Sequence, residues 1–169
     1  MKKLLSKAIT ATLGVLALAG ANVVAAQEAD WLDDDLSVRK EIVLTPGADG
    51  AGLDVAASVF PFALRLSTQT LAFDDVQPDG ADLRVAGADG ARVDHYVENF
   101  DPKAGLATVW VKGTNLNPSS TQTYHLYYGG DVASTSNSAG IFDASEMLAL
   151  DFTGGVKDRT RNNNSATTV

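Results

Sequence analysis

The chain has 169 residues, including 21 acidic residues and 13 Lys or Arg residues, so its formal net charge at pH 7 is −8. This balance disfavours binding to nucleic acid and to anionic lipid headgroups, because both carry negative charge. The sequence has no cysteine, so the fold depends on a hydrophobic core without a disulfide.

Residues 1–26 are predicted to be a signal peptide. Three lysines precede an uncharged apolar stretch from Ala8 to Val24, and small residues follow up to Ala26. We expect cleavage after Ala26 and a periplasmic or secreted product with no transmembrane helix. A membrane anchor is the alternative, but the apolar run is short for a bilayer and contains two glycines and an asparagine. Removing the three lysines leaves ten cationic residues against 21 acidic ones, a mature net charge of −11.

From residue 37 onward, short stretches with alternating apolar side chains predict β-strands. The stretches are 38–44, 60–66, 83–85, 93–100, 106–112 and 124–128. Turn-forming pairs such as Asp79-Gly80 and Asp89-Gly90 separate them. The predicted fold is all-β, an antiparallel β-sandwich of jelly-roll type over residues 27–130. Because proline cannot donate a ladder hydrogen bond, Pro61 predicts that the second strand lies at an edge or begins near it.

The apolar members of these stretches predict one buried core. The stretch 106–112 is apolar on both faces, so we expect both faces to be covered. The expected core residues are Phe60, Phe62, Leu64, Leu83, Val85, Val109, Trp110 and Val111.

After Gly130 the composition becomes polar, which predicts a linker over residues 131–141. Residues 142–169 contain one further apolar stretch near Leu150 and then a polar run. We expect everything after about Gly130 to lie outside the stable fold. The alternative is that the predicted strand within residues 141–152 docks on an open edge of the first domain.

Several elements, in their order and spacing, resemble a known family. They are Trp31 with Arg39 and Lys40, Phe60-Pro61, Phe73 followed by Asp79 to Arg84, Trp110-Val111-Lys112, and Tyr127-Tyr128-Gly129. Together they resemble a bacterial exported domain of unknown function found at the N-terminus of MotA/TolQ/ExbB proton-channel family proteins. Residues 142–169 are similar to the truncated start of a concanavalin A/laminin-G-like lectin domain, which commonly follows in that family.

This resemblance implies an exported sensor or docking module attached to an energised envelope complex. The channel helices of the family have no counterpart in this sequence, so proton conduction is not carried over. The family offers no catalytic residues to transfer.

Two groups of residues are candidates for a metal. The acidic loop from Asp74 to Asp82 offers several carboxylates to calcium, although its spacing does not match an EF-hand. The alternative is an Asp79-Gly80 turn with solvated Asp74 and Asp75, while Asp82 pairs with Arg84 or caps backbone. The two histidines, His95 and His125, have no zinc-ligand spacing and are expected to be ordinary strand residues. No residue is therefore assigned a catalytic, cofactor-binding or metal-binding role.

The aromatic residues are candidates for a stacking platform. They are Trp31, Trp110, Tyr96, Tyr124, Tyr127 and Tyr128. Strand parity places Tyr124 and Tyr128 on one face and Tyr127 on the other, so core packing is expected for at least half of the six.

Two functions fit the sequence, and neither is enzymatic, since no nucleophile and base or carboxylate pair stands in a recognisable frame. The first is a non-catalytic recognition or docking module associated with an envelope MotA/TolQ/ExbB-type biopolymer transport system. The alternative is a glycan-binding, lectin-like module aided by calcium. The expected partner is an envelope protein or an extracellular polymer, and nucleic acid is not expected.

Overall fold

The computed structural model describes residues 31–142, 146, 148–152 and 156–164. The predicted signal peptide and its cleavage site lie outside these residues. Among the residues described, no helix is long and apolar enough to cross a bilayer.

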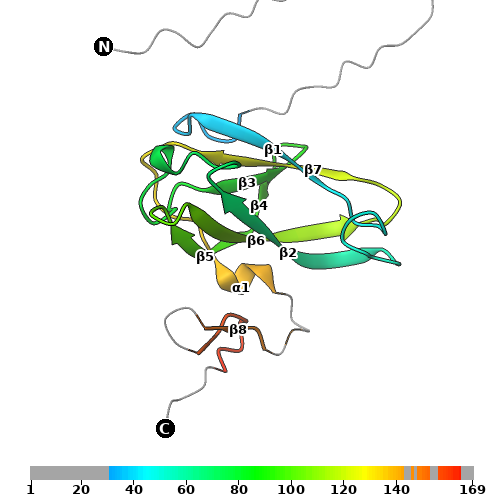
Figure 1. Ribbon diagram of the computed structural model, residues 1–169. Helices are drawn as coiled ribbons and strands as arrows, with labels where there is room; N and C mark the ends of the chain where they lie inside the picture. The colour runs from blue at the N-terminus through cyan, green and yellow to red at the C-terminus, as the bar shows by residue number, and fades with distance from the viewer. Residues whose placement is uncertain (1–30, 143–145, 147, 153–155, 165–169) are drawn as a thin grey trace, which may run out of the picture.

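Two antiparallel sheets pack face to face, which confirms the predicted β-sandwich (Figure 1). Sheet A has the order β1 (Val38–Leu44), β7 (Gln122–Tyr128), β3 (Arg84–Gly87) and β4 (Arg92–Val93). Sheet B has the order β2 (Ala57–Ser67), β6 (Leu106–Leu116) and β5 (His95–Asp101). These seven strands are one fewer than the eight of a jelly roll.

The core lies between the sheets because alternate side chains of each strand point inward. Sheet A contributes residues such as Val85 and Leu126, and sheet B contributes Val109 and Val111, all of them at most 1% exposed. A 3₁₀ helix, η1 (Phe73–Asp75), adds Phe73 to the same cluster. The edge position predicted from Pro61 is confirmed, since within the described part of the chain β2 pairs with β6 alone and begins at Ala57.

The predicted strand at 93–100 is in fact two strands in different sheets. Val93 ends β4 and pairs with Val85 of sheet A, whereas His95 begins β5 and pairs with Val111 of sheet B. Only Asp94 separates them, and its carbonyl accepts a hydrogen bond from the Lys112 amide at 3.0 Å. The alternation of apolar side chains did not predict this corner, because every second residue still points into the core after the chain passes from one sheet to the other.

Two of the predicted core residues lie outside the core cluster. Trp110 is half-buried on the outer face of sheet B, with its ring centroid 6.3 Å from that of Phe142. Phe60 is half-buried opposite Gly113 near the start of β2. The interpretation that both faces of β6 belong to one core is wrong, because only the face with Ala107, Val109 and Val111 is fully buried.

Residues 131–137, here called the strap, do not form the free linker that composition predicted. At its start, the strap runs against sheet A. Gln77 donates from its side-chain nitrogen to the carbonyl oxygen of Val132 at 3.0 Å, and the Arg84 guanidinium donates to that of Ala133. Val132 also packs against a small cluster on the outer face of sheet A.

The end of the strap lies along the open edge of sheet B. The backbone amide of Val97 donates to the Ser136 hydroxyl at 2.9 Å, and the amide of Asn137 donates to the His95 carbonyl at 2.9 Å. These bonds satisfy backbone groups of β5 that have no partner strand on that side. Edge docking was considered from sequence for residues 141–152, whereas the segment on this edge is the strap.

A short helix, α1 (Ser138–Ile141), then packs beneath the outer face of sheet B (Figure 1). Its Ile141 side chain is fully buried. Beyond it, β8 (Leu150–Asp151) and β9 (Lys157–Asp158) form a two-residue ladder. The predicted domain limits at 130, 141 and 142 themselves stay predictions.

We expect truncation after Gly130 to lower the free energy of unfolding by about 3 kcal/mol or more, through lost hydrogen bonds and the lost burial of Ile141. Truncation after Phe142, which keeps these contacts, is the matched control and should stay close to the full mature chain. Urea midpoints measure both. Equal midpoints for the two truncated chains would contradict the docking of the strap and α1.

Candidate functional site

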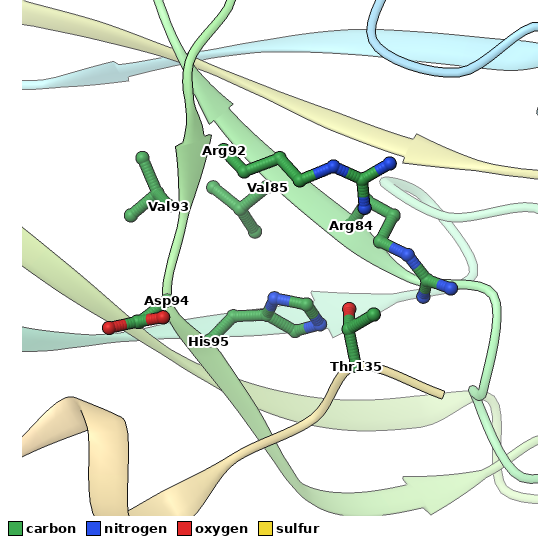
Figure 2. A pocket seen from close by; sticks show the side chains of 7 residues that line it. All are labelled: Arg84, Val85, Arg92, Val93, Asp94, His95 and Thr135. Atoms are coloured by element: carbon green, nitrogen blue, oxygen red, sulfur yellow. The ribbon is translucent and has the colours of Figure 1, made fainter. Parts of the chain in front are cut away.

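A pocket of about 100 Å³ opens where the hairpin β3–β4 meets the first residue of β5 (Figure 2). The strap closes one side of it with Thr135. The lining residues are Arg84, Val85, Arg92, Val93, Asp94, His95 and Thr135. In Figure 2 the two guanidinium groups lie on one side of the imidazole of His95, with the Thr135 side chain between the strap and Arg84.

The turn between β3 and β4 sets the positions of the two arginines. Gly90 has a φ of +79°, and the Ala91 amide donates to the Asp89 carboxylate at 3.0 Å. This turn fixes a register in which Ala86 faces Arg92 and Val85 faces Val93. The valines therefore point into the core, while Arg84 and Arg92 share the outer face of sheet A.

Arg84 is 3% exposed, and its guanidinium is held by backbone carbonyls. Nη1 donates to the carbonyl oxygens of Ala81 and Leu83 at 2.7 and 2.8 Å, and Nη2 donates to that of Ala133 in the strap. Its Nε is buried, and among the residues described it has no hydrogen-bond partner. Burial lowers the pKa of Arg84, with a further contribution from Arg92. The ordinary pKa of arginine is so high that the group stays charged at neutral pH.

His95 is 3% exposed, and its Nε2 is buried without a hydrogen-bond partner in the described part of the chain. Burial is the main cause that lowers the pKa of His95 below its usual value, and the charge of Arg84 acts in the same direction. His95 is therefore neutral at pH 7.

The other charged groups at the pocket already have partners. Arg92 is exposed at the mouth and pairs with Asp33 at 3.1 Å. The pKa of Asp33 is lowered, mainly because its carboxylate accepts the Asp35 amide, and Arg92 contributes.

The Asp94 carboxylate lies 3.7 Å from Lys112 Nζ on the outer side of sheet B. Because Asp94 interacts with Lys112, it does not orient the ring of His95 as a catalytic acid would.

The arrangement therefore suits binding. It offers the positive charge of two arginines to an acceptor, and Arg84 Nε and His95 Nε2 have no hydrogen-bond partner among the residues described.

The acidic loop does not gather its carboxylates at one point. Asp82 is fully buried and accepts the amides of Gln77, Gly129 and Gly130 at 2.9, 2.7 and 3.2 Å. Asp79 accepts the Ala81 amide and forms the turn, whereas Asp74 and Asp75 are exposed. No group of three or more His, Cys, Asp or Glu that could hold a metal occurs in the described ranges. Backbone capping by Asp82, one of the weighed readings of this loop, is what the structure shows.

We expect Asp82→Ala to lower the free energy of unfolding by about 3 kcal/mol or more, because it leaves three backbone amides without their acceptor. Asp79→Ala, which removes one exposed turn bond, should cost less than about 1 kcal/mol. Urea unfolding of both variants measures the difference, and similar losses would show that Asp82 has no special structural role.

The six aromatic candidates do not form one surface. Tyr124, Tyr127 and Tyr128 are at most 5% exposed. Trp31 is 41% exposed and packs edge-on against Tyr127, with ring centroids 5.5 Å apart. Tyr96 lies on the opposite sheet and donates to Asp151 at 3.2 Å. Burial is the largest of the causes that raise the pKa of Tyr96 to about 12, so it remains a donor at neutral pH.

Sequence reasoning missed Arg84, Arg92 and Thr135 as neighbours, and it treated His95 as an ordinary strand residue. His125 lies on sheet A opposite Ala86 and does not line the pocket. The Asp89-Gly90 turn was a usable signal for the arginines. With Val85 and Val93 facing inward, a hairpin at that turn requires Arg84 and Arg92 to share the other face.

Part of the chain matches a protein-family model. Residues 79–155 match a family model described as a domain of unknown function, DUF2341. The DUF2341-like region is less than half of the chain, yet it includes every pocket residue and continues through the strap and α1. No curated protein and no solved structure matches.

The DUF2341-like region supports a domain of unknown function in this stretch of sequence. It begins well after Trp31, where the predicted resemblance began, and extends past Gly130, where that resemblance ended. A single family model thus covers both sides of the predicted boundary at residue 130.

The lowered pKa of His95 predicts a loss of stability in acid. The unfolded state, with an ordinary histidine pKa near 6.5, takes up a proton before the folded state does. Stability should therefore fall as the pH drops through about 6.5 toward the folded pKa, by at most about 1.4 kcal/mol per pH unit from this group. His95→Gln should have a shallower slope between pH 7 and 5.5 in urea unfolding. An unchanged slope would mean that His95 titrates normally in the folded state.

Proposed function

We propose that the mature chain is a non-catalytic, exported recognition module that docks onto a partner in an envelope transport system of the MotA/TolQ/ExbB type. The observation that supports binding is the pair of buried, unpartnered polar atoms, Arg84 Nε and His95 Nε2, in a pocket open at the edge of the sandwich. A buried polar group without a partner costs about 1–3 kcal/mol, so a ligand that supplies the partner gains affinity there.

The pocket is also built on well-supported elements. Its arginines come from a short hairpin, its histidine from a core-packed strand, and its far wall from a strap hydrogen-bonded to both sheets. Rigid support of this kind reduces the ordering that binding requires. The envelope setting is supported by the predicted signal peptide and by the resemblance to channel-associated exported domains.

The alternative is a lectin-like, glycan-binding module. Its support is Trp31, which is exposed on the outer side of sheet A with the Arg39 guanidinium 5.4 Å from its ring centroid. An aromatic face beside a charged group is a common sugar-binding surface.

We expect the immobilised mature chain to retain a MotA/TolQ/ExbB-type protein from detergent-solubilised bacterial envelope, identified by mass spectrometry. Arg92→Glu should reduce retention at least about fivefold, because it reverses the charge at the pocket mouth. Arg65→Glu is the matched control, since Arg65 is exposed on β2, outside the pocket.

Equal retention by the wild type and Arg92→Glu would contradict docking through this pocket. A rise in melting temperature with a neutral saccharide, abolished by EDTA, would favour the glycan-binding alternative.

A further inference from the structure

We propose that the pocket formed by Arg84, Arg92 and His95 is a binding site for a single carboxylate group. The inference rests on the proposed function, because it names the chemistry that the same pocket recognises.

The unpartnered atoms define what the ligand must offer. Arg84 Nε always carries a hydrogen, so it can only donate. The guanidinium cannot turn away, because its other nitrogens are bound to Ala81, Leu83 and Ala133. The ring of His95 is hydrogen-bonded to the backbone of Val93 and Leu83, so the donor that the pocket residues leave unpartnered is Arg84 Nε. The ligand is therefore an acceptor and not an amine or a metal ion.

The charges around the pocket favour a monoanion. Two arginine charges line it, and Arg92 at the mouth is free to contact a ligand because more than half of its side chain is exposed. Two carboxylates, Asp33 and Asp94, lie at the rim and are paired with Arg92 and Lys112. With these pairs in place, the one positive charge left to balance is that of Arg84. A carboxylate brings one negative charge, whereas a phosphate dianion brings two.

The volume of the pocket also favours a carboxylate group over a larger group. A volume of about 100 Å³ is smaller than the engineered cavity of about 150 Å³ that binds benzene, and it is enough for a carboxylate and the carbon that bears it. A sugar ring or a nucleotide base does not fit, so the rest of the ligand extends through the open mouth past Arg92. An acidic side chain, a chain terminus or a small organic acid all present this group.

The test uses acetate, the simplest carboxylate, and the ¹⁵N-labelled mature chain. The chain has two histidines, so two imidazole spin systems report on binding, and His125→Asn assigns them. Sodium acetate is titrated against sodium chloride at constant ionic strength and pH 7. We expect saturable shifts of the His95 ring signals, an unmoved His125 and a dissociation constant on the order of 1–10 mM.

Arg92→Gln should weaken acetate binding about fivefold or more, and Arg65→Gln should leave it unchanged. Absence of a saturable His95 shift, binding of inorganic phosphate as tight as that of acetate, or equal effects of the two substitutions would overturn the carboxylate assignment.

The two proposals can fail separately. If acetate does not bind while Arg92→Glu still abolishes envelope capture, recognition stands and the ligand chemistry is wrong. If acetate binds while capture ignores Arg92→Glu, the site is real and the docking function is wrong.

Discussion

The buried carboxylate of Asp82 is the interaction on which the rest of the site depends. It lies two residues before Arg84 and accepts the amides of Gly129 and Gly130, where β7 ends. Gly129 has a φ of +88°, and a Cβ there would come within 2.3 Å of the Ser37 hydroxyl, so the corner requires glycine. By fixing this corner, Asp82 sets where the strap leaves sheet A and therefore where Thr135 meets the pocket.

Asp82 and Arg84 are each held by backbone hydrogen bonds and not by a salt bridge to each other. The carboxylate uses three amides, and the guanidinium uses three carbonyls. Charge-assisted bonds to backbone hold a buried ion in place without cancelling its charge by a salt bridge. The ion pairs found in the described residues involve Arg92, Lys112 and Arg159. The charge of Arg84 consequently remains available to the pocket.

Local patterns in the sequence predicted most of the sandwich and little of the site. Alternation placed Val85, Val109 and Val111 in the core, and Pro61 placed β2 at an edge, because both features act within one strand. The corner at Asp94 and the position of Trp110 depend on which sheet a strand joins and on what covers its outer face. Neither is encoded locally. The pocket combines residues from 84 to 135, so its assembly follows from the topology, and only the Arg84 and Arg92 pair could be read from a turn.

The polar composition of the strap predicted a linker, because a segment with few apolar side chains buries little apolar surface. In the structure, hydrogen bonds hold the strap against the sandwich. Its Ser136 hydroxyl and its backbone at Ala133 and Asn137 make hydrogen bonds to the two sheets, which require no apolar side chain. Covering an open strand edge in this way prevents that edge from pairing with another chain.

The same polar segment also forms a wall of the pocket, so edge closure and the proposed ligand binding involve the same segment. The Ala133 carbonyl helps to hold the guanidinium of Arg84 in its orientation at the pocket. A ligand that binds this orientation stabilises the docked strap by mass action, and release of the strap removes both the orientation of Arg84 and the wall at Thr135. If the pocket binds a carboxylate as proposed, the fraction of molecules with a docked strap and the affinity of the pocket for its ligand increase together.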